Sequence, residues 1–179
     1  NIILSNKFKG YFMSIKEIIT YPIKDLLDAL RKRIISVEEL TNIHINQINS
    51  INSSLNAVVQ YSFDSALKTA KFMDNNFNDN NTKPLFGLPF TLKDSIDTKG
   101  IISTWGTEGR TNFIPKHNAT VAERLINAGG ILMGKTNTPE FTMGGETDNV
   151  PYGRTNNPYN IEFTTGGSSG GAAAIISAC

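Results

Sequence analysis

Apolar residues recur every three or four positions through the first third of the chain, which is the spacing of an amphipathic helix. One such stripe covers residues 23–30 and follows Pro22, a residue tolerated at a helix start. A second stripe covers residues 37–51. Ser36 precedes it, and Glu39 follows three positions after Ser36, which is the signature of a capping box. The pattern therefore predicts a pair of helices.

The pattern predicts a third helix over residues 64–75, which ends in an Asn-rich loop over residues 75–81. Beyond this loop the pattern changes to short apolar runs beside Gly and Pro. Residues 85–92 have the composition of a buried strand approached through a Gly/Pro turn, and Lys93 closes that strand.

A further helix is predicted by Thr120 and Glu123, which form a second capping-box pattern. This helix should stop at the glycine pair 129–130, and residues 131–134 then resemble another buried strand. Strands separated by capped helices indicate an α/β architecture with a largely buried sheet.

Composition and charge narrow the class of protein. The 179 residues are 39% hydrophobic and 18% charged, as in a soluble globular domain, and the net charge of +1 gives no case for direct nucleic acid binding. The first twenty residues lack the continuous apolar stretch of a signal peptide or a membrane span. The single cysteine, Cys179, allows no internal disulfide, so we expect a cytoplasmic protein that does not bind membranes.

The most informative segment is residues 165–174, Thr-Gly-Gly-Ser-Ser-Gly-Gly-Ala-Ala-Ala. Four glycines surround two serines and lead into small apolar residues, which predicts a loop that feeds a helix. Glycines permit positive φ angles and close approach to a ligand, and the first N–H groups of a helix can face a polarised carbonyl.

Three interpretations of this segment compete. The apolar residues that follow it argue against a flexible linker, which has no reason to enter a buried helix. The glycine spacing argues against a phosphate-binding loop, because no Lys follows Gly171. A catalytic serine loop is the interpretation that we favour.

Six motifs, taken in order, resemble the amidase signature family. They are Leu-Lys-Asp at 92–94 and Gly-Gly-Ser-Ser-Gly-Gly at 166–171, with Gly-Leu-Pro at 87–89, Ala-Thr-Val at 119–121, Gly-Lys-Thr-Asn-Thr-Pro-Glu-Phe at 134–141 and Tyr-Gly-Arg-Thr-Asn-Asn-Pro at 152–158. Each motif is weak alone, but their order and spacing are specific. The resemblance implies an α/β fold, the N-terminal part of the amidase signature fold, with a mixed β-sheet flanked by helices on both faces.

The resemblance also implies a Ser-Ser-Lys catalytic triad. Lys93 matches its general base, and Ser168 matches its bridging serine, which the family holds with a cis peptide bond. The supporting residues of the loop are Ser169, Gly166, Gly167 and Gly170. A lysine must be neutral to accept a proton, and burial at a strand end would lower its pKa. The alternative for Lys93 is a snorkelling or ion-paired lysine.

Two aspartates, Asp94 and Asp97, follow Lys93 closely in the sequence. A neighbouring carboxylate raises the pKa of a lysine, which opposes the role of a base. Side chains alternate along an extended strand, so Asp94 should lie on the opposite side from Lys93. We therefore expect structural roles for both aspartates.

In the family, the attacking serine lies roughly two dozen residues beyond the bridging serine, in a second Gly-rich segment that also forms the oxyanion hole. No such segment occurs after Ser168 in this sequence. We therefore expect residues 23–179 to be the first part of an amidase domain, truncated before the nucleophile, with residues 1–22 as a variable extension. Residues 1–179 alone should be inactive as a hydrolase.

Within the family, several segments look more like stand-alone amidases, which act on a small-molecule amide and could form a homodimer. These segments are residues 138–140, 145–149 and 154–158. One alternative is the A subunit of glutamyl-tRNA(Gln) amidotransferase, a glutaminase that works with partner subunits, and the other is a non-catalytic truncated product. No cofactor or metal is expected, because two histidines and one cysteine do not make a ligand set.

Overall fold

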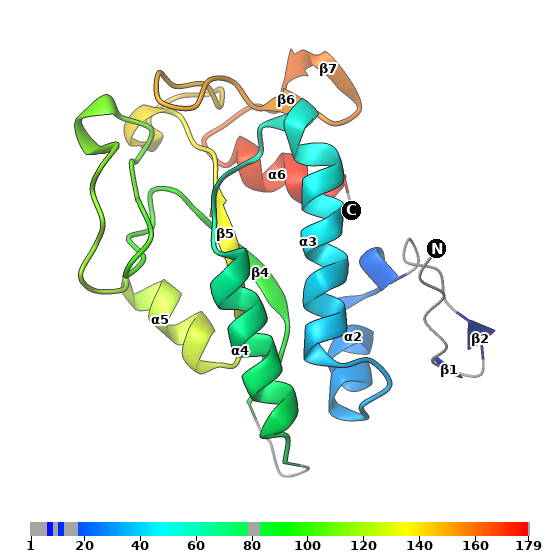
Figure 1. The fold of residues 1–179 in the computed structure, drawn as a ribbon. Coiled ribbons are helices and arrows are strands. Elements are labelled where there is room, and N and C mark those ends of the chain that lie inside the picture. The colour runs from blue at the N-terminus through cyan, green and yellow to red at the C-terminus, as the bar shows by residue number, and fades with distance from the viewer. Residues whose placement is uncertain (1–6, 9–10, 13–17, 79–82, 179) are drawn as a thin grey trace.

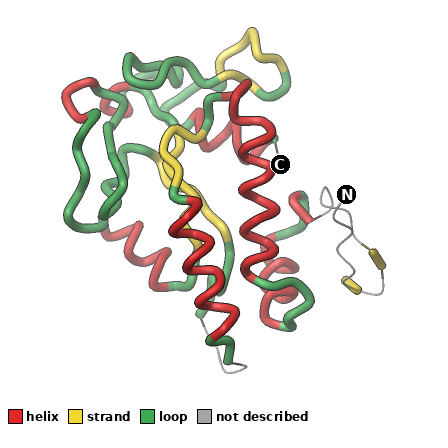
Figure 2. The backbone as a smooth tube through the Cα atoms, viewed as in Figure 1, coloured by secondary structure: helices red, strands yellow, loops and turns green. Residues whose placement is uncertain are grey.

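The computed structural model describes residues 7–8, 11–12, 18–78 and 83–178 (Figure 1). The helices are α2 (Ile23–Arg31), α3 (Val37–Leu55), α4 (Phe63–Asn75), α5 (Thr120–Asn127) and α6 (Gly170–Ser177), with single 3₁₀ turns η1 (Glu108–Arg110) and η2 (Glu140–Thr142). The strands are β1 (Lys7–Phe8), β2 (Tyr11–Phe12), β3 (Val58–Tyr61), β4 (Pro89–Lys93), β5 (Ile131–Thr136), β6 (Asn156–Asn157) and β7 (Asn160–Thr164). Long loops separate β4 from α5 and β5 from β6 (Figure 2).

A three-stranded mixed sheet lies at the centre of the fold, in the order β3-β5-β4. The middle strand β5 runs parallel to β4 and antiparallel to β3. The parallel register pairs Leu92 with Lys135 and Lys93 with Thr136, so the carboxyl ends of β4 and β5 lie side by side. The mixed sheet that the family resemblance implied is therefore confirmed.

Helices cover both faces of this sheet, as expected. On one face, Met133 of β5 lines a pocket together with Ile48 of α3 and Ile175 of α6. On the other face, Leu132 lines a second pocket with Ile126 of α5. Met133 and Ile175 belong to the main core, and α3 supplies much of the remainder of that core.

The predicted start of α3 is confirmed. The hydroxyl of Ser36 accepts a hydrogen bond from the N–H of Glu39 at 3.0 Å, and the Glu39 carboxylate accepts one from the N–H of Ser36 at 2.8 Å. Asp74, near the end of α4, accepts from the next two N–H groups, those of Val37 and Glu38, at 2.9 Å each. Helix α4 is therefore tied to the beginning of α3.

The second predicted capping box is wrong. The N-cap of α5 is Ala119, not Thr120, and no side-chain hydrogen bond caps this helix. The N–H of Ala119 donates to the carbonyl oxygen of Asp97 at 2.8 Å, and its own carbonyl accepts from the N–H of Glu123 at 3.0 Å. This anchorage makes the chain enter the helix one residue earlier, so Thr120 is its first residue and is not a cap.

The strand predicted over residues 85–92 is too long. Strand β4 begins only at Pro89, because the preceding residues form a turn in which Gly87 has a φ of +70°. The N–H of Gly87 donates to the carbonyl of Gly129, just after α5, at 2.9 Å. Strand β4 is also half-buried along most of its length and only Leu92 is buried, because β4 is an edge strand of the described sheet.

Helices α2, α4 and α5 and strand β5 agree with the prediction to within two residues, whereas α3 continues to Leu55, four residues beyond the predicted stripe. Helix α4 ends at Asn75, where the Asn-rich loop was expected, although residues 79–82 of that loop lie outside the described part, as does Cys179. Ile18, within the segment expected to be a variable extension, is buried in the main core. No helix in the described part of the chain is long and apolar enough to cross a bilayer.

Candidate active site

The structure brings Lys93 and the serine loop together, although they are far apart in the sequence. Lys93 is the last residue of β4, and Ser168 lies in the loop that enters α6. The Lys93 Nζ atom donates to Ser168 Oγ at 2.7 Å and to Ser169 Oγ at 3.2 Å. The three side chains that the family motif singles out therefore form one hydrogen-bonded cluster.

The surroundings of Lys93 lower its pKa relative to that of a free lysine. Its side chain is half-buried, and burial lowers the pKa of its ammonium group. The neighbouring Asp94 turns away from it: its carboxylate accepts hydrogen bonds from the N–H and the hydroxyl of Thr104, at 3.0 and 2.6 Å. The expectation that Asp94 lies on the opposite side of the strand is thus confirmed.

Asp97 also has a structural role. Its carboxylate accepts hydrogen bonds from the indole N–H of Trp105 at 3.0 Å and from the guanidinium group of Arg110 at 2.9 Å. The same guanidinium stacks on the Trp105 ring, 4.1 Å from its centroid. Asp97 therefore fixes the loop that follows β4 and leaves the lysine free of an ion pair with it.

The glycines allow the loop to reach Lys93. Gly166 has a φ of +72°, a conformation that side chains with a Cβ atom rarely adopt. A Cβ atom on Gly167 would lie 2.7 Å from the carbonyl oxygen of Gly144 and 3.0 Å from the nitrogen of Glu146. The peptide bond between Gly167 and Ser168 is cis, as the resemblance implied. The loop is thus packed tightly against residues 144–146.

Two threonines that the sequence did not single out hold this loop. The hydroxyl of Thr147 accepts from the N–H of Gly170 and donates to the carbonyl of Gly166, both at 2.9 Å. The hydroxyl of Thr138 donates to the carbonyl of Ser168 at 3.0 Å. Thr138 lies in the family motif at residues 134–141 and Thr147 in the segment 145–149, but nothing in the sequence indicates which loop atoms they contact.

Asn137 is a second positioning residue that the sequence did not single out. Its side-chain amide donates to the carbonyl of Gly153 and to the hydroxyl of Thr155, each at 3.0 Å. Its side-chain oxygen accepts from Asn149 at 2.7 Å and from the N–H of Thr138 at 3.0 Å. Asn137 thereby joins the end of β5 to the long loop before β6. The next residue, Thr138, connects this hydrogen-bond network to Ser168.

The geometry determines what this cluster can do. A neutral Lys93 lies within hydrogen-bond distance of the Ser168 hydroxyl and can accept its proton. The Ser168 oxygen can then take a proton from a third group on its other side. The contact is thus one that a general base and a bridging hydroxyl would require.

Comparisons with known proteins identify the family of this chain. A profile of the family described as Amidase matches residues 39–179. The A subunit of glutamyl-tRNA(Gln) amidotransferase from Caldanaerobacter subterraneus subsp. tengcongensis is 37% identical over 162 residues, which are 90% of this chain and 33% of that protein. The chain thus spans about a third of the length of this relative.

Two solved structures share the fold. A bacterial aryl acylamidase of the amidase signature family superimposes with a TM-score of 0.81 and 29% identity, covering 87% of this chain and 33% of that one. The A subunit of glutamyl-tRNA(Gln) amidotransferase from Thermotoga maritima superimposes with a TM-score of 0.65 and 25% identity, covering 92% and 31%. From its matching profile, its fold and the arrangement of its motifs, the chain belongs to the amidase signature family.

Proposed function

We propose that the protein containing this chain is an amidohydrolase, which converts a carboxylic amide into an acid and ammonia or an amine, with Lys93 and Ser168 as two members of a Ser-Ser-Lys triad. The observation that carries the proposal is the 2.7 Å contact between Lys93 Nζ and Ser168 Oγ. Membership of the amidase signature family supports it independently.

In the proposed mechanism Lys93 acts as the general base. Burial lowers the pKa of Lys93, so a larger fraction of it is neutral near physiological pH than of a free lysine. The neutral amine accepts the proton of Ser168, and Ser168 takes the proton of the attacking serine. When the tetrahedral intermediate collapses, the same chain of groups returns a proton to the leaving amine.

The attacking serine is proposed to come from a segment outside residues 1–179, at the distance from Ser168 that the family resemblance implies. Water then hydrolyses the acyl-serine intermediate, with Lys93 again as the base. In this scheme Ser169 orients Lys93, because its hydroxyl is a second acceptor for the Lys93 Nζ atom at 3.2 Å.

The experiment that tests this proposal uses the product of the complete reading frame. Hydrolysis of an aryl amide such as an anilide is measured for the wild type and for Lys93→Ala and Ser168→Ala. Loss of a general base or its relay lowers the rate by about 10²–10⁴-fold. The matched control is Lys99→Ala, which removes an exposed lysine from the loop after β4.

Wild-type hydrolysis that both variants lose, and that the control keeps, would support the proposal. Full activity in Lys93→Ala would overturn the assignment of the base. If the reading frame ends at residue 179 and its product hydrolyses no amide, a non-catalytic product replaces the hydrolase as the proposed function.

A second candidate is the glutaminase subunit of a tRNA-dependent amidotransferase. The observation that favours it is the 37% identity to the A subunit of such an enzyme, whereas the segments at residues 138–140 and 145–149 resemble the stand-alone amidases more. Replacing the anilide by glutamine in the same assay separates the two. A stand-alone amidase hydrolyses the anilide without any partner, whereas the transferase subunit releases ammonia from glutamine and depends on partner subunits.

A further inference from the structure

Lys135 is a fully buried lysine at the carboxyl end of β5 that the proposed mechanism does not use. Its Nζ atom donates to the carbonyl of Ile96 at 2.7 Å, to the hydroxyl of Ser103 at 2.8 Å and to the carbonyl of Asp94 at 3.3 Å. An ammonium group has three N–H donors, so these acceptors satisfy it completely. Such a buried cation is costly unless each of its donors is paired.

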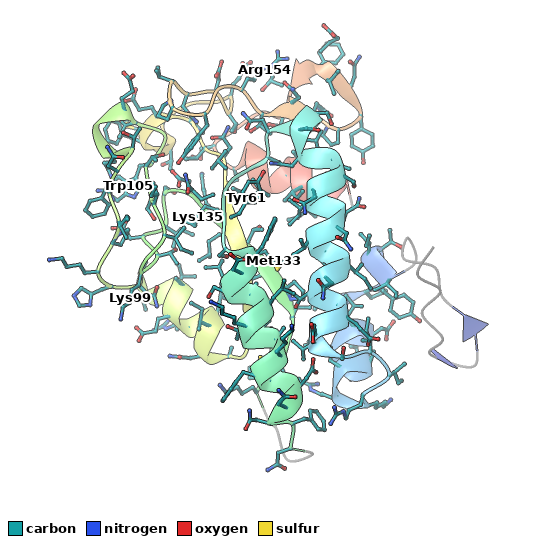
Figure 3. The ribbon with its side chains drawn as sticks, in the orientation of Figure 1. Tyr61, Lys99, Trp105, Met133, Lys135 and Arg154 are labelled. Carbon is teal, nitrogen blue, oxygen red and sulfur yellow. The ribbon has the colours of Figure 1, made fainter. Side chains whose placement is uncertain are left out.

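Two of the three acceptors, the carbonyls of Asp94 and Ile96, belong to the turn that directly follows Lys93, and Ser103 lies further along the same loop. The N–H of Ile96 donates to the carbonyl of Lys93 at 2.9 Å, and the N–H of Asp94 donates to the carbonyl of Thr136 at 2.8 Å. Lys135 therefore fixes the backbone of the turn that follows Lys93, the proposed general base. Figure 3 shows Lys135 between β5 and the loop that carries Lys99 and Trp105.

The two lysines lie on opposite faces of the sheet. The register pairs Lys135 with Leu92, and side chains alternate along β4, so Lys93 faces the other way. On its own face, Lys93 contacts the hydroxyls of Ser168 and Ser169. Any effect of Lys135 on Lys93 must therefore pass through the turn after β4 or through the electric field of the charges behind it.

Three charged groups act on Lys135. Burial lowers its pKa to about 8, the carboxylates of Asp94 and Asp97 oppose this change, and the guanidinium of Arg110 adds to it. Lys135 is therefore mainly protonated at neutral pH. Its positive charge attracts the Asp94 carboxylate over a longer distance than an ion pair. A carboxylate near a lysine favours the protonated form of that lysine, and a positive charge near the carboxylate opposes this effect.

We propose that Lys135 is a positioning residue for Lys93: its ammonium group holds the turn after β4 in place and offsets the Asp94 carboxylate behind the base. The inference rests on the proposed function, in which Lys93 must lose its proton to act. It adds a residue on the opposite face of the sheet to the groups that control the base.

The test compares Lys135→Met, which keeps the length of the side chain, with the wild type and with the control Lys99→Met, all made from the complete reading frame. Without Lys135, the Asp94 carboxylate is uncompensated and the turn loosens, so Lys93 holds its proton to a higher pH. The acid limb of the kcat/KM profile should therefore move to higher pH in Lys135→Met, while that of Lys99→Met should stay in place. Should Lys135→Met fail to fold, Lys135→Gln, which keeps an N–H donor, takes its place.

A second variant separates positioning from a merely structural role. Adding Asp94→Asn to Lys135→Met removes the uncompensated carboxylate, so the acid limb should move back towards that of the wild type. A residue that only holds the fold together would lower the rate evenly across the pH range, and the limb would stay in place. An unmoved limb in Lys135→Met would overturn the proposal.

A direct measurement separates failure of this inference from failure of the proposed function. Acylation of Lys93 by acetic anhydride, followed by mass spectrometry across a pH series, reports the protonation of Lys93 without any amide hydrolysis. If the wild type hydrolyses no amide, the proposed function fails, but an upward shift of the labelling curve in Lys135→Met still supports the role of Lys135. An unshifted labelling curve refutes it.

Discussion

The side chain of Asn52 joins the end of α3 to the beginning of β3, and its removal should strongly destabilise the fold. Its Oδ1 atom accepts from the N–H groups of Ala57 and Val58, at 2.9 and 2.8 Å. Its Nδ2 atom donates to the carbonyl of Val58 at 2.8 Å and to the Tyr61 hydroxyl at 2.6 Å. Ala57 and Val58 are buried, so water cannot replace these contacts without opening the core.

The magnitude follows from the groups that Asn52→Ala would leave unpaired. Each buried N–H without a partner costs about 1–3 kcal/mol, and two such groups are created. The higher helix propensity of alanine offsets only a few tenths of a kcal/mol, roughly the difference between Ala and Asn in host peptides. We therefore predict a loss of about 2–5 kcal/mol in the free energy of unfolding, which corresponds to a decrease in melting temperature on the order of 10 °C.

The assay is urea-induced unfolding followed by circular dichroism. The matched control is Asn46→Ala, the same substitution at an exposed position of the same helix, which should change the free energy of unfolding by no more than about 0.5 kcal/mol. If Asn52→Ala unfolds at the same urea concentration as this control, the hydrogen bonds of Asn52 do not carry the stability assigned to them.

Two further predictions concern Lys135 and Gly171. Between pH 8 and 10.5 the unfolded chain keeps the Lys135 proton that the folded protein has released, since burial lowers its pKa from 10.5 to about 8. The free energy of unfolding of the wild type should therefore rise by up to about 3 kcal/mol relative to that of Lys135→Met as the pH rises through this range. Urea unfolding at pH 8 and at pH 10.5 measures this change. If the two proteins differ in stability by the same amount at both pH values, the prediction is wrong. Gly171→Ala places a Cβ atom against the backbone of Asn137 and 2.7 Å from the carbonyl oxygen of Ala57. We expect this variant to lose about 1–3 kcal/mol in the free energy of unfolding and to lose amide hydrolysis. Gly109→Ala, where the Cβ atom meets nothing within 4 Å, is the control, and equal stability of the two variants would refute the clash.

Local signals in the sequence predicted the elements that depend on nearby residues. Ser36 and Glu39 are three residues apart, so their reciprocal capping bonds follow from the helix itself. The same pattern at Thr120 failed, because the carbonyl of Asp97, a residue distant in sequence, anchors Ala119 and fixes where α5 begins. A cap can be predicted from sequence only where no tertiary contact competes with it.

The candidate site was predictable only as far as the family motifs extend. Lys93 and Ser168 stand in those motifs, and the structure places them in contact. Thr147 and Asn137 could not be assigned roles, because their partners lie in other loops and the sequence gives no distance between loops. The sequence contains one indication of Lys135: it follows a predicted buried strand, as Lys93 ends β4.

The strand order β3-β5-β4 also sets the sequence of events as the chain is synthesised. The middle strand is the last of the three to be made, so neither outer strand can pair within this sheet until β5 emerges. The two helices α3 and α4, which are neighbours along the chain and contact each other, can associate much earlier. The entropy of closing both long connections is then lost in one event, the insertion of β5. A ribosome-bound chain stalled before residue 131 would therefore hold the helical pair without the central sheet.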